Sequence, residues 1–225
     1  MKTIGESMYN NKSKIDINIV NKGTILSDVF ESFNLNDLSI ISSHTSRVVN
    51  LSKIIANKYD EDEEKVFLAS LLHDIAGVIS SKRWVEFCSE NSIAISDLER
   101  KIPILTHQKI SKWIASNVYN ITDSEILSAI ECHTTLKKNP SNTDLIVFIA
   151  DKIEWDQQGE PPYKSAMLNA LDISLEKSAL IYISYVIDNN LLKVPHPWIL
   201  EARFALERSI KTTHNTTSEQ RSTGE

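Results

Sequence analysis

Histidine and aspartate residues recur on apolar segments of this 225-residue chain, where their side chains would project into a protein core. Six of them follow one another along the sequence: His44, His73, Asp74, His107, His133 and Asp151. Imidazole and carboxylate groups are ligands for divalent iron, manganese and zinc, whereas a structural zinc site would use cysteine. Any one of these residues also has an ordinary explanation as a hydrogen-bonded core residue. Their recurrence in this order predicts a metal centre.

Asp151 is the most informative of the six, because it ends a stretch that is apolar on all sides. Residues 145–150 read Leu-Ile-Val-Phe-Ile-Ala, which predicts a buried helix. A carboxylate at the end of such a helix is costly unless a cation or a metal ion neutralises it. Asp151 is therefore either the partner of a buried Lys or Arg or a metal ligand, and the four histidines favour the second role.

The segments that must position these residues have the pattern of α-helices. Between residues 41 and 55, apolar residues and His44 recur every three or four positions, which places them on one helix face. Capping patterns indicate two helix starts, at residues 122–125 (TDSE) and 141–144 (SNTD). Glycine is scarce, with 5 in the chain, and no alternating strand pattern is visible. The sequence therefore predicts an all-α fold.

One compact domain over residues 24–211 accounts for the helical patterns. Residues 1–23 are mostly polar, and we expect them to form a mobile N-terminal segment. Residues 212–225 contain no large apolar side chain, which predicts a disordered polar tail. The apolar stretch 179–187 fits either the core or an interface, so a homodimer stays open.

Composition limits the classes of partner. The chain has 24 Lys and Arg against 30 Asp and Glu, and this net charge of −6 argues against a protein that binds nucleic-acid polymers through their phosphates. The 2 cysteines do not make a disulfide framework and fit a reducing compartment. The sequence begins without the apolar core of a signal peptide, and no run reaches about 18 consecutive apolar residues. We therefore expect a cytoplasmic protein with no membrane anchor.

The ordered set His44, His73–Asp74 and Asp151 resembles the HD-domain superfamily of metal-dependent phosphohydrolases. Within that superfamily, the sequence is most similar to the bacterial YqeK-type symmetrical diadenosine tetraphosphate hydrolases. The similar stretches run from about residue 43 to residue 206 and include HTSRVVNLSKIIANKY, LASLLHDIAG, ILTHQKISKWIA, ILSAIECHTT, DLIVFIADKIE and PHPWILEARFAL. The resemblance implies a single-domain HD-type helical bundle with the metal centre in its core.

This resemblance also implies which residues hold which of two divalent ions. The first ion would be held by His44, His73, Asp74 and Asp151, and the second by Asp74, His107 and His133. Asp74 would then bridge the two ions and orient a hydroxide between them, which makes it the catalytic residue. Iron is the usual metal of the family and manganese a substitute, and the ligand types alone also leave zinc open.

The activity that the resemblance implies is hydrolysis of a phosphoanhydride bond in a nucleotide. In diadenosine tetraphosphate, the hydroxide that bridges the ions would attack at the central anhydride and release two ADP. Two other interpretations stay open. One is another HD-type enzyme, such as a nucleotidase or a (p)ppGpp or cyclic-nucleotide hydrolase, and the other is a nucleotide sensor without catalytic activity. His107 and His133 argue against a single-metal enzyme, and the complete ligand set argues against a sensor.

Five residues are candidates for contact with the substrate: Arg47, Thr134, Thr135, His196 and Arg203. Arg47 lies one helical turn after His44, where it contacts either a phosphate or a surface carboxylate. The two threonines directly follow His133, and they either bind a phosphate or cap the helix. His196 either lines the pocket or stabilises a turn between two prolines. Arg203 either belongs to the pocket or pairs with Glu201 or Glu207.

Two features depart from the family pattern and remove positive charge from the expected polyphosphate site. Gly77 stands where the family commonly has a lysine. The helix of Asp151 continues as DKIEWDQQGEPP, without the family's Asp-x-Ile-Glu-Pro-x-Arg. Lys109 and Lys152 lie so close to expected ligands that they should point elsewhere on their helices. Two aromatic residues past this helix are candidates to stack on a base: Trp155 and Tyr163.

Overall fold

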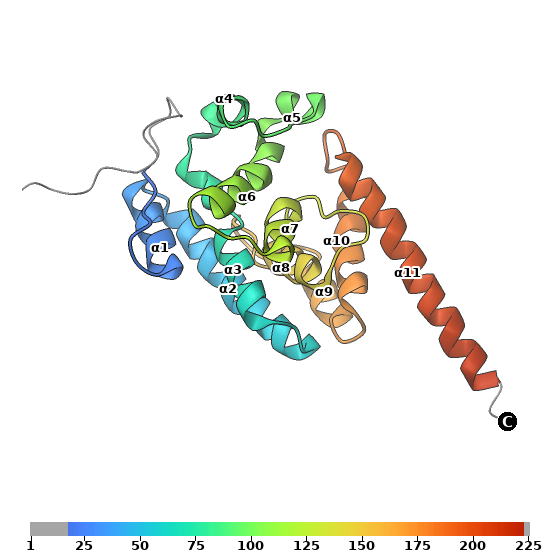
Figure 1. Cartoon of the computed structure of the whole chain (residues 1–225). Coiled ribbons are helices and arrows are strands. Elements are labelled where there is room, and N and C mark those ends of the chain that lie inside the picture. The colour runs from blue at the N-terminus through green and yellow to red at the C-terminus, as the bar shows by residue number, and fades with distance from the viewer. Residues whose placement is uncertain (1–17, 223–225) are drawn as a thin grey trace, which may run out of the picture.

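The computed structural model describes residues 18–222, with side chains described as far as residue 212. This part of the chain is helical and contains no strand (Figure 1). The α-helices are α1 (Ile25–Leu35), α2 (Ser39–Tyr59), α3 (Glu63–Leu72), α4 (Trp84–Glu90), α5 (Asp97–Lys101), α6 (His107–Asn117), α7 (Ser124–Cys132), α8 (Asn142–Ile153), α9 (Lys164–Ala170), α10 (Leu175–Asp188) and α11 (Pro197–Ser222). Short 3-10 helices are η1 (Ile75–Val78), η2 (Ser81–Arg83) and η3 (Pro103–Thr106). The predicted all-α class is confirmed.

Helix α8 is the buried centre of the bundle. Its residues 145–150 are at most 1% exposed, as their apolar character predicted. The helix packs against α2, α3 and α7, which precede it in the sequence, and against α9 and α10, which follow it. Because α8 is enclosed by its neighbours, the direction of its last turn, which carries Asp151, is fixed by packing.

Helices α3 and α8 pack against each other, and both contact α2 and α7. Helix α6 packs onto α7. Two clusters of buried apolar side chains hold this arrangement. One is built around α1, α3, α4, α6 and α7, and the other joins α2 and α8 to α9, α10 and α11. The candidate ligands all come from α2, α6 and α8 or from the one or two residues that follow α3 and α7.

The two predicted helix starts differ in their outcome. Ser141 caps α8 as predicted. Its hydroxyl accepts from the backbone N–H of Asp144, and the Asp144 carboxylate accepts from the backbone N–H of Ser141. Helix α7 begins one residue later than predicted, because Asp123 rather than Thr122 is its N-cap. The Asp123 carboxylate accepts from the backbone N–H groups of residues 125 and 126, which is the geometry that favours aspartate at this position.

Residues 18–23 are packed against the domain, where we had expected mobility up to residue 23. Val20 is buried and its backbone N–H donates to the Ser32 hydroxyl, while the Asn21 amide donates to the Val118 carbonyl. The carboxylate of Asp28 accepts from the backbone N–H groups of residues 22 and 23. The rest of the predicted mobile segment, residues 1–17, lies outside the described residues.

Helix α11 continues to Ser222, where we had expected a disordered tail from residue 212. No proline or glycine interrupts the sequence between residues 198 and 223, so no residue there breaks the helical backbone. The end of the helix extends away from the bundle (Figure 1). Residues 223–225 lie outside the described residues.

None of the helices in residues 18–222 combines the length and the apolar character that crossing a bilayer requires.

Candidate metal centre

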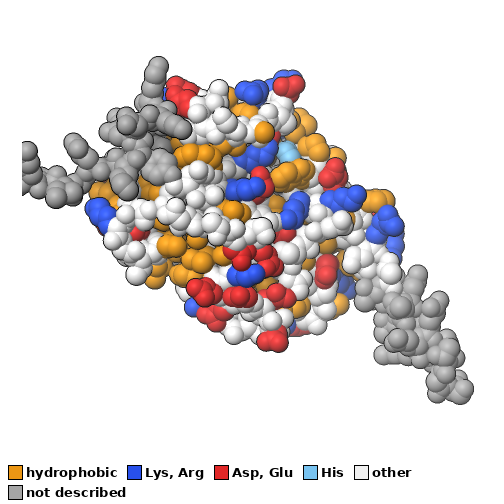
Figure 2. Space-filling model, viewed as in Figure 1, with side chains coloured by type: hydrophobic (Ala, Val, Ile, Leu, Met, Phe, Trp, Pro, Cys, Tyr) orange, Lys and Arg blue, Asp and Glu red, His pale blue; other side chains and the backbone are white. Residues whose placement is uncertain are grey.

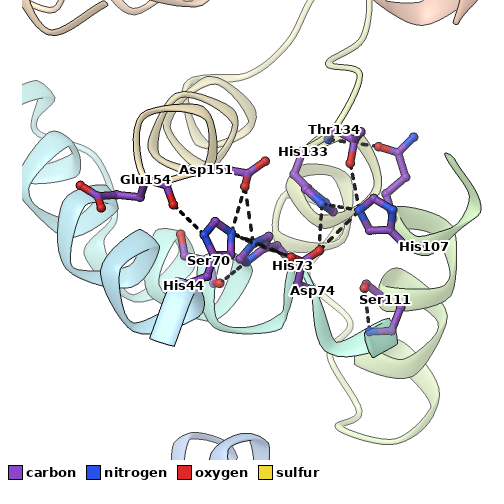
Figure 3. A network of polar contacts seen from close by, with 12 residues as sticks. His44, Ser70, His73, Asp74, His107, Ser111, His133, Thr134, Asp151 and Glu154 are labelled. Carbon is purple, nitrogen blue, oxygen red and sulfur yellow. Dashed lines mark hydrogen bonds and ion pairs between the residues drawn. The ribbon is translucent and has the colours of Figure 1, made fainter. Parts of the chain in front are cut away.

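The structure brings the six predicted ligand residues together in two groups (Figure 3). His44, His73 and Asp151 form the first triad, and Asp74, His107 and His133 form the second triad. Within each triad, the potential ligand atoms lie within 4.8 Å of one another. Most of these residues lie at helix ends: His73 and His133 are the C-caps of α3 and α7, His107 begins α6, and Asp151 lies in the last turn of α8.

Asp74 lies between the two triads, and its two carboxylate oxygens face different partners (Figure 3). Its Oδ2 is 3.5 Å from His73 Nε2 and 3.9 Å from His44 Nε2. Its Oδ1 is 3.4 Å from the Nε2 atoms of both His107 and His133. One carboxylate can therefore contribute an oxygen to each of two neighbouring ions, which is the bridging position expected for this residue.

The four histidines are held in the same tautomer. Each Nδ1 donates to a backbone carbonyl, which can only accept: His44 to Glu154 (2.7 Å), His73 to Ser70 (2.7 Å), His107 to Ile104 (2.5 Å) and His133 to Ile130 (2.8 Å). In a neutral imidazole whose Nδ1 carries the proton, Nε2 is an acceptor. In its neutral form each ring thus turns its Nε2 lone pair toward the centre, and a hydrogen bond from the other ring nitrogen is the usual way to orient a metal-binding histidine.

The spacing of these lone pairs fits bound cations. The Nε2 atoms of His107 and His133 are 2.9 Å apart, and those of His44 and His73 are 3.3 Å apart. Neutral imidazoles in this tautomer have no proton to share between the facing nitrogens, and a cation between them would favour this close approach of two lone pairs. The C-terminal ends of α3, α7 and α8 also point at the centre, and their dipoles favour positive charge there. The donor set therefore fits two divalent ions.

Burial keeps two of the imidazoles available as neutral ligands. It lowers the pKa of His73 to about 4, and burial together with the charge of His133 lowers the pKa of His107. Burial alone would also lower the pKa of His44, but the hydrogen bond and the charge of Asp151 outweigh it and raise the value. Near neutral pH, His73 and His107 can bind a metal ion without first losing a proton.

Both carboxylates of the centre stay ionised. Burial alone would raise the pKa of Asp74, but the surrounding imidazoles, led by His73, hold it well below its usual range. Burial would likewise raise the pKa of Asp151, and the charge of Lys152 and the hydrogen bond to His44 hold it well below. Ionised carboxylates are the form that divalent cations require.

The centre opens to solvent on the side of Asp74 and His107. The side chains of these residues are 26% and 13% exposed, whereas those of His73 and His133 are at most 2% exposed. On the face in Figure 2, Lys and Arg side chains are interspersed with acidic and apolar side chains rather than gathered in one patch. The Asp151 side chain of the first triad is 12% exposed, so the open side of the centre extends from His107 and Asp74 to Asp151.

Thr134 lies at the centre and Thr135 does not. The Thr134 hydroxyl is 3.0 Å from His107 Nε2, in the region that a ligand would share. Thr135 is buried, and its hydroxyl donates to the carbonyl of Leu136. Gln108, which the sequence analysis did not single out, connects the two by accepting from the Thr134 N–H and donating to the Thr135 hydroxyl. The expected substrate contact of Thr135 is replaced by this structural role.

Arg47 pairs with a carboxylate, which is the second of the two roles considered for it. Its Nε donates to Glu154 Oε2 (3.2 Å), one terminal nitrogen to the Ser43 hydroxyl (3.0 Å) and the other to the Trp155 carbonyl (3.1 Å). It therefore fastens the end of α8 to α2, next to the carbonyl that orients His44. Arg47, Glu154 and Trp155 also line a pocket of about 530 Å³, and none of the triad residues is part of its lining.

His196 and Arg203 are engaged away from the centre, and among the described residues neither forms a hydrogen bond or ion pair with a triad residue. His196 accepts from the N–H of Trp198 through Nδ1, and its Nε2 faces Glu99 at 3.9 Å. Arg203 on α11 pairs with Asp188 (2.7 Å) and Glu207 (3.0 Å). The pairing with Glu207 is one of the alternatives given above, and both residues have structural roles.

Lys152 belongs to the centre, contrary to our expectation that it would point elsewhere. Its ammonium contacts Asp151 Oδ2, while Asp151 Oδ1 is 3.1 Å from His44 Nε2. The Lys152 ammonium also lies 5.4 Å from the ring centre of Phe148 and 5.7 Å from that of Tyr182. Burial alone would lower the pKa of Lys152, but the charge of Asp151 outweighs it and raises the value, so the ammonium stays charged.

The family model of the HD domain matches residues 41–156, which are more than half of the chain and include all six candidate ligands. The chain belongs to the HD domain family. A protein of Lactococcus lactis subsp. cremoris, described as an uncharacterized protein in the pepC 5'region, is 42% identical over 192 residues, which cover 77% of this chain and 98% of that protein.

Two further HD-domain relatives carry names that mention an activity. The symmetrical bis(5'-nucleosyl)-tetraphosphatase of Staphylococcus aureus is 32% identical over 112 residues, which cover 50% of this chain and 57% of that enzyme. The crystal structure of a predicted HD superfamily hydrolase involved in NAD metabolism from Clostridium acetobutylicum is 27% identical, with a TM-score of 0.74. That match covers 84% of this chain and 100% of the other.

Proposed function

We propose that this HD-domain protein is a dimetal phosphohydrolase that cleaves a phosphoanhydride bond of a nucleotide. The observation that carries the proposal is the position of Asp74, with Oδ2 toward the Nε2 atoms of His44 and His73 and Oδ1 toward those of His107 and His133. In this proposal the first ion is held by His44, His73, Asp74 and Asp151, and the second by Asp74, His107 and His133. Family membership supports a metal-dependent hydrolase, and the donor types leave iron, manganese and zinc as candidates.

The ions, when bound, supply Lewis acidity toward phosphate oxygens and water. The residues of the chain supply the positioning. Asp74 fixes the spacing of the two sites, and the four Nδ1–H bonds keep the imidazoles aimed at the centre. The Thr134 hydroxyl, on the more open side, can hydrogen-bond a phosphate oxygen next to His107. Such preorganised donors lower the cost of charge that develops on phosphate oxygens during cleavage.

The substrate that we place first is diadenosine tetraphosphate, cleaved symmetrically to two ADP. The printed name of the Staphylococcus aureus relative supports this choice, although the match covers about half of either chain. A pocket of about 530 Å³, lined by Arg47, Glu154 and Trp155, is within the volume range of small-molecule sites, and the carbonyl of Glu154 connects it to His44.

The test is metal analysis and turnover of the protein purified without oxygen. We expect about two ions per chain and ADP as the sole nucleotide product from diadenosine tetraphosphate. Asp74→Asn should lower the rate by about 100-fold or more, because it removes a charge that both ions use. ATP and AMP as products would contradict symmetrical cleavage. Two ions without turnover would contradict the substrate, and a protein that binds no ion would contradict the proposed function as a whole.

A further inference from the structure

Lys152 brings a positive charge to a centre whose other cationic side chains are occupied or distant. Among the described residues, it is the only Lys or Arg that forms an ion pair with a carboxylate of either triad. Its side chain is 12% exposed, so the ammonium lies near the surface of the centre rather than deep in the core.

The ammonium of Lys152 has hydrogen-bonding capacity left over. An ammonium has three N–H donors, and within the described part of the chain Asp151 Oδ2 is the oxygen that accepts from it. The rings of Phe148 and Tyr182 flank it at 5.4 and 5.7 Å, which holds the charge in place without using its donors fully. A group with oxygen acceptors and negative charge would complete this environment.

Two other positions near the centre do not provide such a charge. Arg47 donates to Glu154, Ser43 and the Trp155 carbonyl, and among the described residues it forms no hydrogen bond or ion pair with a triad residue. Gly77 has no side chain, and a Cβ there would lie 2.6 Å from Ile41 Cδ1, so α2 occupies the space into which a longer residue would grow. A phosphate group at the centre would therefore meet Lys152, the cationic side chain that pairs with a carboxylate of the centre.

We propose that Lys152 binds a non-bridging phosphate oxygen of the substrate beside Asp151 and so acts as a phosphate-binding residue of the centre. This inference rests on the proposed function only in that the ligand carries phosphate groups. Asp151 has one oxygen toward His44 and the other toward Lys152, so the carboxylate orients the ammonium while it serves the first triad. An ammonium fixed in this way needs little reorganisation to meet a phosphate.

The test is the binding of inorganic pyrophosphate and of ADP to metal-loaded protein, measured by calorimetry, with metal content determined on the same samples. The variants are Lys152→Met, which removes the charge, and Lys152→Arg, which keeps it. Lys112→Met is the matched control, because Lys112 on α6 also pairs with a carboxylate, that of Glu131 at 2.7 Å. Lys152→Gln replaces the methionine variant if that protein does not fold.

We expect the dissociation constant for pyrophosphate to rise at least tenfold in Lys152→Met, with metal content unchanged and with Lys152→Arg and Lys112→Met within about threefold of the unmodified protein. Equal affinities in Lys152→Met and Lys112→Met would overturn the proposal. Loss of metal from Lys152→Met would also overturn it, because Lys152 would then act through Asp151. If the unmodified protein binds pyrophosphate but does not cleave diadenosine tetraphosphate, the proposed substrate fails while this inference is still decided by the binding data.

Discussion

Replacing His107 with alanine tests whether the two triads hold separate ions. His107 Nε2 lies 3.4 Å from Asp74 Oδ1 in the second triad, and the first triad does not include it. The side chain is 13% exposed, so its removal opens little of the core. We therefore expect His107→Ala to fold, to keep the ion of the first triad and to bind about one ion per chain in place of two.

The expected effect on thermal stability follows from mass action. An ion present at 100 times its dissociation constant stabilises the folded state by about 2.7 kcal/mol. For a domain of this size, each kcal/mol raises the melting temperature by roughly 2–4 °C. Each ion that saturates its site to this degree should therefore raise the melting temperature by about 5–10 °C. The unmodified protein should gain two such increments, and His107→Ala should gain one.

The assay compares melting temperatures with and without added manganese and measures metal content by mass spectrometry. His196→Ala is the matched control, since it removes a histidine that is equally part of the described fold but lies at Glu99. The control should retain the rise in melting temperature from both ions. Retention of two ions in His107→Ala would refute the assignment of the second triad, and simultaneous loss of both would refute the view that the triads bind separately.

Three further predictions concern stability. Arg47→Met should lower the melting temperature by about 2–4 °C, because the partly exposed pair with Glu154 contributes up to about 1 kcal/mol; an unchanged melting temperature in scanning calorimetry would contradict the fastening role. Burial would raise the pKa of Glu99, but Lys109 and the backbone of residue 96 outweigh it and lower the value. A carboxyl group whose pKa is lowered by folding adds stability above its unfolded pKa, and this stability is lost as the pH falls. Urea unfolding should therefore show Glu99→Gln destabilised by about 3 kcal/mol at pH 7 and by less at pH 4. An equal difference at both pH values would be inconsistent with this account. Phe33→Ala, in the core on α1, should cost about 3–5 kcal/mol in urea unfolding while leaving metal content unchanged; a loss of metal would show that the two parts of the fold are coupled.

The sequence was sufficient for features that depend on local pattern. The apolar run of residues 145–150 predicted the buried helix α8, because a helix with no polar face has no stable place except the interior. The six candidate ligands could be found for the same reason, since polar side chains on such faces are rare. Ser141 could be identified as an N-cap because the capping box is a local pattern.

Features that depend on tertiary contacts could not be predicted in this way. Lys152 was expected to point away, because neighbours in a helix differ by about 100° in direction, but its long side chain reaches back to Asp151 between two rings. The roles of Arg47 and His196 depend on Glu154 and Glu99, which lie far away in the sequence. The carbonyl of Glu154 that fixes the tautomer of His44 has no sequence signal, since every residue has a carbonyl.

The order of the triads along the chain has a consequence for how the centre is assembled. The second triad uses residues 74, 107 and 133, and all of them fall within the segment from 44 to 151 that the first triad closes. The two sets of ligands therefore define nested loops, and an ion in either one would act as a cross-link that restricts the unfolded chain. During synthesis from the N-terminus, the inner loop has all its ligands before Asp151 has been made. The outer set can form only after α8 has been added, so the centre is completed by the buried central helix, before α9, α10 and α11 have been made.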